Sequence, residues 1–89
     1  MTHRPNLIKQ SLDLDKAEYE IVRNSILKNL LVYGAMTSDE LALLVKDHLE
    51  SKSDSSLWRY YYLVRQELEI RGEIRYVPDT DPLQIEIAM

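Results

Sequence analysis

The chain has 89 residues, of which 45% are apolar and 29% are charged, and it contains no cysteine. This length suits one globular domain, and the lack of cysteine excludes disulfides, cysteine-ligated zinc and thiol catalysis. The net charge of −4 counts against tight DNA binding, because free-standing DNA-binding domains are usually basic. The lack of cysteine fits an intracellular setting, and no apolar run reaches the roughly 18–20 residues that span a bilayer, so we expect a cytoplasmic protein without membrane contact.

The first clear helix is predicted over residues 16–33, after a lead-in over residues 1–15 that is loose or forms a short helix. Apolar residues recur at spacings of three and four, which is typical of one buried helical stripe. They are Tyr19, Val22, Ile26, Leu30 and Tyr33. Asp15 and Glu18 have the spacing of a capping box, and Gly34 suits the left-handed turn that ends a helix. Residues 16–89 are predicted to form one domain.

A second helix is predicted from Thr37 to about Leu49. Thr37 and Glu40 have the spacing of another capping box, while Ala35 and Met36 only connect the two helices. The residues expected to face inward are Leu41, Leu44, Val45 and His48.

A third helix is predicted from about Ser55 to Arg71, after a polar run over residues 51–56 that provides an N-cap. Its inward stripe consists of Leu57, Tyr61, Val64 and Leu68. Residues 73–77 and 83–87 then alternate polar and apolar side chains around a segment rich in proline and aspartate. Two alternating runs around such a turn predict a β-hairpin.

The order of three helices and a hairpin resembles that of winged-helix DNA-binding domains. The run from Val64 to Ile74 resembles the end of their third helix and the start of their first wing strand. The run from Thr37 to Ala42 resembles the start of their second helix. The similarity covers roughly residues 16–88 and implies an α+β winged-helix fold: a three-helix bundle followed by a two-stranded antiparallel β-hairpin wing.

In DNA-binding winged helices, the N-terminal part of the third helix reads base edges in the major groove. The resemblance places Lys52, Ser55, Ser56, Arg59, Tyr60 and Tyr62 at or just before that part of the helix. Wings often add basic contacts, but the tip of this hairpin carries Asp79 and Asp81. Carboxylates repel phosphates, so the sequence counts against a contact between the wing and DNA.

The run of aromatic residues 58–62 has two interpretations. Aromatic side chains beside a basic residue can stack on bases or reach phosphates, but they also pack in cores. The helical spacing favours packing for Trp58 and Tyr61. For Arg59 and Tyr62, which lie away from the inward stripe, a DNA contact and a solvated surface stay equally open.

Two helices carry apolar residues on a second face. At 100° per residue, Leu63 and Ile70 lie opposite the inward stripe of the third helix. Ile21 and Val32 lie opposite the stripe of the first helix, with Leu31 nearby. Two such faces predict a homodimer or a tight contact with another protein.

No motif points to catalysis, a metal, a cofactor or a small-molecule ligand. His3 and His48 are far apart and have no further ligands around them. Asp79 and Asp81 fit the expectation for turn residues exposed to water. We therefore expect that the chain is not an enzyme.

Two functions follow from the sequence. The first is a winged-helix DNA-binding transcriptional regulator that reads the major groove of double-stranded DNA with its third helix. The second is a winged-helix protein–protein interaction module, or a subunit of a complex, that does not bind DNA. The resemblance favours the first function, and the acidic net charge favours the second.

Overall fold

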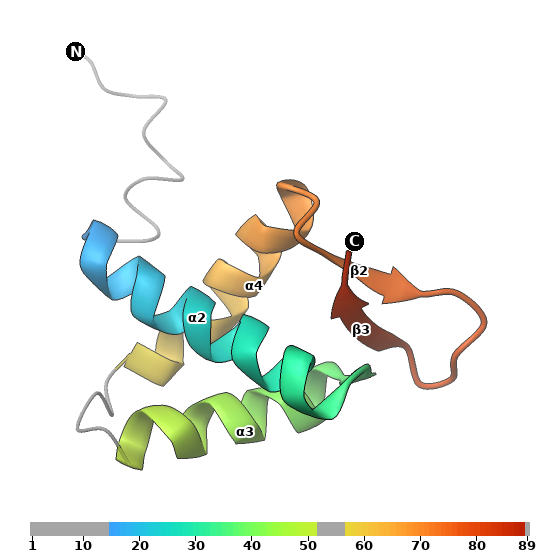
Figure 1. The fold of residues 1–89 in the computed structure, drawn as a ribbon, viewed down its shortest axis with the longest axis horizontal. Coiled ribbons are helices and arrows are strands. Elements are labelled where there is room, and N and C mark those ends of the chain that lie inside the picture. Colours follow the sequence, from blue (N-terminus) through green and yellow to red (C-terminus); the bar gives the residue numbers. More distant parts are fainter. Residues whose placement is uncertain (1–14, 52–56, 89) are drawn as a thin grey trace.

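A computed structural model describes residues 15–51 and 57–88 and has the predicted order of helices and strands (Figure 1). The helical elements are α2 (Lys16–Tyr33), α3 (Ser38–Ser51), the 3-10 turn η2 (Leu57–Tyr60) and α4 (Tyr61–Ile70). The strands are β1 (Met36–Thr37), β2 (Ile74–Val77) and β3 (Gln84–Ile87). The predicted α+β class, with three helices followed by a β-hairpin, is therefore confirmed.

Both predicted capping boxes are present. The Glu18 amide donates to Asp15 Oδ1 at 2.8 Å, and the Asp15 amide donates to Glu18 Oε1 at 3.2 Å. At the start of α3, the Thr37 amide donates to Glu40 Oε1 at 2.9 Å, and the Glu40 amide donates to Thr37 Oγ1 at 3.2 Å. These bonds satisfy amides that have no partner within a helix, so both helices begin where their sequences predict.

The core lies where the inward stripes of the three helices meet the hairpin. Its buried apolar residues are Val22, Ile26, Leu30, Met36, Leu41, Val45, Leu49, Leu57, Tyr61, Val64, Leu68, Ile74 and Ile85. The prediction for Tyr33 was wrong, because its side chain is 66% exposed. The chain turns at Gly34, whose φ is +83°, and Met36 just beyond this turn enters the core instead.

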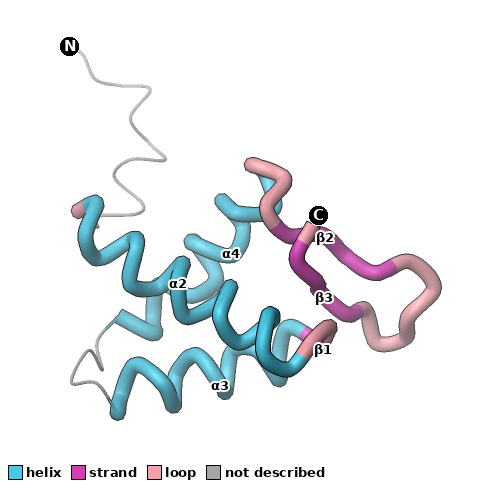
Figure 2. The backbone as a smooth tube through the Cα atoms, in the orientation of Figure 1, coloured by secondary structure: helices cyan, strands magenta, loops and turns pink. Residues whose placement is uncertain are grey.

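The sheet contains one strand more than predicted. Met36 and Thr37, expected to connect two helices and to cap the second, form β1, which pairs antiparallel with β3 (Figure 2). The strand order is β1-β3-β2. A strand of two residues is too short to show alternation in sequence. Its pairing holds the hairpin against the connection between α2 and α3.

The third helix is also divided differently from the prediction. A continuous α-helix from about Ser55 was expected, but a 3-10 turn precedes α4. With three residues per turn, this turn aligns Leu57 and Tyr60 on one side. Leu57 is buried, and Tyr60 packs against the core. The tighter winding thus buries Leu57 and turns the half-buried Tyr60 toward the core.

Candidate nucleic-acid interface

The outer surface of η2 and the first turn of α4 displays aromatic and basic side chains. Trp58 is 39% exposed and Tyr62 is 55% exposed, and Arg59 between them is also exposed. Lys46 reaches this surface from α3, with its Nζ 4.8 Å from the centroid of the Trp58 ring. We call these four residues, Lys46, Trp58, Arg59 and Tyr62, the α4 face.

The α4 face borders a hollow of about 220 Å³ between α3 and the third helix. It is lined by the four residues of the face together with Ala42, Leu43 and Tyr61. The hollow is therefore apolar at its base, with Lys46 and Arg59 supplying two positive charges at its margin. An ammonium group over an indole ring is a favourable contact that leaves the cation accessible to an anion.

Arg59 differs from the other arginines that the structure describes. The other four each lie within 4.0 Å of a carboxylate: Arg23 with Glu73, Arg65 with Glu69, Arg71 with Glu67 and Arg75 with Glu86. Among the described residues, Arg59 has no such partner. A guanidinium group in water without a carboxylate partner retains its full attraction for an external anion.

Arg65 lies next to the α4 face and connects it to the hairpin. Its Nη1 donates to the Tyr76 hydroxyl at 3.0 Å, and its Cζ lies 5.7 Å from the Tyr62 ring. The Arg65 side chain is largely buried. Its contacts therefore fix Tyr62 relative to β2, while Arg59 stays exposed to solvent.

The buried side chain of Tyr61 packs beneath the α4 face. Its ring meets the Tyr62 ring edge-on at 4.9 Å, and its hydroxyl donates to the Ser38 carbonyl at 3.1 Å. Burial raises the pKa of Tyr61 to about 12. The hydroxyl therefore stays protonated well above neutral pH and keeps α4 attached to the start of α3.

The sequence located only part of this surface. Arg59 and Tyr62 lie on it, whereas Lys52, Ser55 and Ser56 fall outside the described residues. Tyr60 was expected among the DNA contacts, but the 3-10 turn directs it toward the core. The interpretation of Trp58 as a packed residue was incomplete, because a large part of its surface is exposed.

Lys46 was not found from the sequence. It belongs to a different helix from Trp58, and helical spacing relates only residues within one helix. The contact between α3 and η2 brings the two side chains together. No signal in the sequence pairs them.

The hairpin tip is acidic in the structure as well. Asp79 and Asp81 are exposed, and Thr80 between them holds the turn. The Thr80 hydroxyl donates to the Val77 carbonyl and accepts a bond from the Gln84 amide, both at 2.9 Å. The tip is thus a formed turn that presents two carboxylates to solvent.

The predicted partner face is divided in the structure. Leu31, Val32 and Ile70 are exposed, but Ile21 and Leu63 are half-buried, and Ile21 packs against the core. Helix α2 packs against α3, η2, α4 and β3, so its buried surface is wider than one stripe. The C-terminal ends of α2 and α4, which carry the exposed Leu31, Val32 and Ile70, also lie apart in Figure 1. The five residues do not form one face, and the homodimer stays a prediction.

The fold and the α4 face define a small α+β domain with an exposed basic and aromatic surface. The chain belongs to a protein family of unknown function, DUF6958, whose family model matches residues 1–85. Searches of curated proteins and of solved structures gave no significant match. Within residues 15–51 and 57–88, no helix is long and apolar enough to cross a membrane, and no three potential ligands gather to hold a metal ion.

Proposed function

We propose that this chain is a winged-helix DNA-binding transcriptional regulator that places its third helix in the major groove. The observation that carries the proposal is Arg59, the one described arginine without a carboxylate partner, exposed beside Tyr62 and close to Lys46. The other four described arginines each have a carboxylate within 4.0 Å. Arg59 is the exception, at the part of the third helix where winged helices read bases.

The chemistry of the α4 face suits a duplex. An arginine can donate two hydrogen bonds to the O6 and N7 atoms of guanine, which is the commonest specific contact in the major groove. A lysine can approach a phosphate, and a tyrosine hydroxyl can donate to one. The acidic hairpin tip would repel phosphates, so we expect it to make no contact with the DNA backbone. Such a regulator acts where DNA is accessible, and we propose the cytoplasm as its location.

A titration with duplex DNA tests this proposal. Isotope-labelled protein is titrated with a mixed-sequence duplex at low salt, and the amide shifts are followed by NMR. We expect shifts at Lys46 and over residues 57–62 that fade as salt is added, because phosphate binding releases counterions. If no shift appeared at millimolar concentrations of both components, the proposal would be wrong.

Two matched variants locate the contact. Arg59→Ala is expected to weaken DNA binding by about tenfold or more, consistent with the loss of roughly 1–3 kcal/mol for a base-reading arginine. Lys16→Ala removes the same charge from another exposed side chain, at the start of α2, and should change the affinity less than about twofold. Equal effects of the two variants would show that only net charge matters and would contradict this docking.

A further inference from the structure

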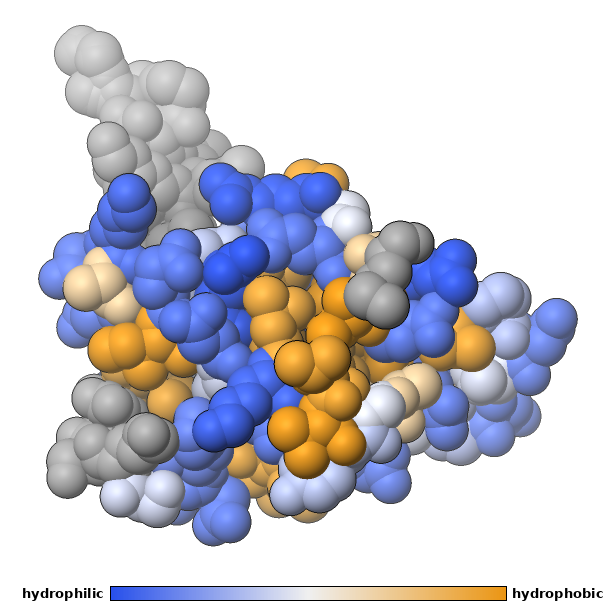
Figure 3. Space-filling model, in the orientation of Figure 1, coloured by the Kyte–Doolittle hydropathy of each residue, from blue (hydrophilic) through white to orange (hydrophobic). Residues whose placement is uncertain are grey.

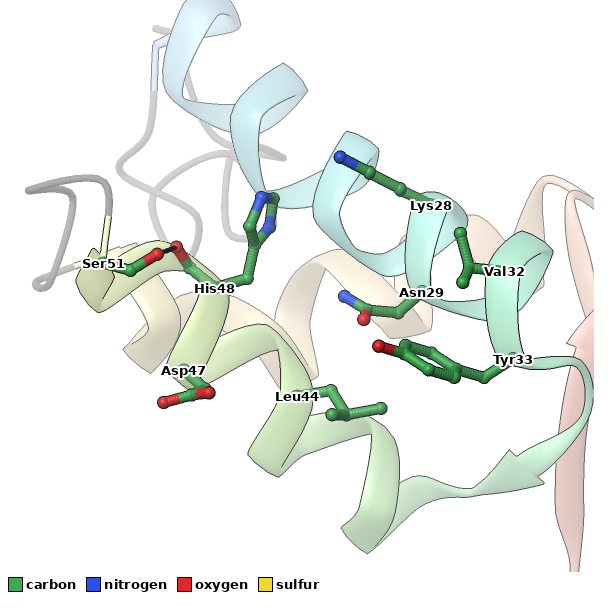
Figure 4. A pocket seen from close by; sticks show the side chains of 8 residues that line it. All are labelled: Lys28, Asn29, Val32, Tyr33, Leu44, Asp47, His48 and Ser51. Atoms are coloured by element: carbon green, nitrogen blue, oxygen red, sulfur yellow. Dashed lines mark hydrogen bonds between the residues drawn. The ribbon is translucent and has the colours of Figure 1, made fainter.

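A second surface of the molecule is a groove between α2 and α3, lined by both apolar and polar side chains and acidic along its α3 side. One hollow of about 310 Å³ lies between Lys28 to Tyr33 of α2 and Leu44 to Ser51 of α3 (Figure 4). A second hollow of about 380 Å³ continues toward Met36 and Glu40. Both are lined by Tyr33 and Leu44, so they form one continuous groove, which we call the α2–α3 groove.

Apolar side chains cover the middle of the groove. Figure 4 shows Tyr33 of α2 and Leu44 of α3 pointing toward one another across it, with Val32 on the same wall. Val32 is 61% exposed and Tyr33 is 66% exposed, and Figure 3 shows apolar side chains gathered over the C-terminal part of α2. Exposed apolar area of this kind is covered favourably at about 25 cal/mol per Å².

The α3 side of the groove carries more negative than positive charge, with Lys46 as the one lysine of α3 and Lys28 on the α2 side. Helix α3 has four exposed carboxylates, Asp39, Glu40, Asp47 and Glu50. None of them forms an ion pair with another described residue, whereas Glu67, Glu69, Glu73 and Glu86 elsewhere all do. Asp47 and Glu50 also border a shallow hollow with Lys46, Leu43 and Leu44 on the outer side of α3. Two carboxylates and one lysine therefore lie beside the exposed Leu43 and the half-buried Leu44.

The walls of the groove restrict the conformation of what it can hold. Both walls are helices, whose backbone groups bond within the helix, so the groove has no strand edge for an extended peptide. A helix that satisfies its own backbone can occupy it. The stretch of α3 from Glu40 to Ser51 is about 16 Å long at 1.5 Å per residue, which matches about three helical turns.

We infer that the α2–α3 groove binds a basic amphipathic helix of a partner protein. The partner would lay an apolar stripe over Val32, Tyr33 and Leu44, and its lysines or arginines would face the carboxylates of α3. A second copy of this chain fits less well, because a two-fold contact through this groove would bring two rows of carboxylates together. This site does not depend on the α4 face.

A synthetic peptide tests the inference. The probe has about 14 residues in two heptads, with leucine at the a and d positions and lysine at e and g. Labelled full-length protein is titrated with it, and we expect saturable amide shifts at Val32, Tyr33 and Leu44. The control peptide keeps the leucines and replaces each lysine with glutamate. We expect it to bind at least about tenfold more weakly, because like charges would face α3.

Neighbouring residues of α2 provide matched variants of the protein. Val32→Glu places a carboxylate in the groove, while Leu31→Glu makes the same change at a 73% exposed residue that does not line it. We expect at least about a tenfold loss of lysine-peptide affinity for the first variant and less than about twofold for the second. Dispersed NMR spectra of both variants would verify that each is folded.

Three results would overturn the inference. One is the absence of shifts in the groove at millimolar peptide, and another is equal binding of the two peptides. The third is a dimer of the free protein that Val32→Glu disrupts and Leu31→Glu does not, because that result would assign the groove to a second copy.

Discussion

The α4 face and the α2–α3 groove have opposite charges although both include α3. Lys46 lies on the α4 face over Trp58, and the next residue, Asp47, lines the groove. A helix rotates its side chains by 100° per residue, so Lys46 reaches the α4 face while Asp47 reaches the groove, although both border the hollow on the outer side of α3. The net charge of −4 averages over both surfaces. A modest net charge of a small domain therefore says little about either surface.

The largest expected effect concerns Tyr61, which supports the α4 face and attaches it to the start of α3. Its pKa rises from 10.0 in water to about 12 in the fold, so the folded state favours the protonated form. The resulting contribution of Tyr61 to the free energy of unfolding is fully present below pH 10 and is lost as the pH rises toward about 12. Two pKa units correspond to a loss on the order of 2–3 kcal/mol.

Tyr61→Phe should remove much of that alkaline loss, at a cost of about 1 kcal/mol near neutral pH for the missing hydrogen bond. Urea unfolding of both proteins at several pH values from about 8 to 12 measures the effect. If the free energy of unfolding of the variant fell as steeply with pH as that of the wild type, Tyr61 would not be the responsible group.

The next effect separates the two surfaces directly. Asp47→Lys combined with Glu50→Lys reverses the charge beside the groove, and we expect the lysine peptide to bind about tenfold more weakly or worse. Affinity for duplex DNA should not fall, and should rise a few-fold at low salt because the net charge is less negative. Calorimetric titration with each ligand checks both expectations. Weakened DNA binding would show that the two ligands share one surface.

The smallest effect concerns the hairpin tip. Asp79→Asn combined with Asp81→Asn removes two negative charges, and asparagine tolerates the left-handed backbone at residue 79, where φ is +64°. If the tip points away from DNA, affinity should increase less than about threefold, and the salt dependence should keep its slope. Fluorescence anisotropy over a series of salt concentrations would measure this. An increase of tenfold or more would place the tip beside the phosphates.

Local sequence patterns predicted most of the fold. The capping boxes at Asp15 and Thr37 depend on residues three apart, and the stripe of the third helix from Leu57 to Leu68 is buried as expected. The 3-10 turn and β1 were missed because both depend on what the chain packs against. Tyr33 has the spacing of the inward stripe of its helix but lies in the α2–α3 groove. Its position also depends on what the helix packs against.

Sequence patterns were sufficient to predict where the first two helices begin, most of the stripe that each helix buries and that a hairpin follows, because capping, periodicity and turn chemistry act over a few residues. It also placed Arg59 and Tyr62 on the outer side of the third helix. Tertiary packing places Lys46 over Trp58 and, among the described residues, brings four arginines to carboxylates but not Arg59. It also places Tyr33 and Leu44 on opposite walls of one groove. Such contacts join elements distant in the chain, and they form only when the helices pack together.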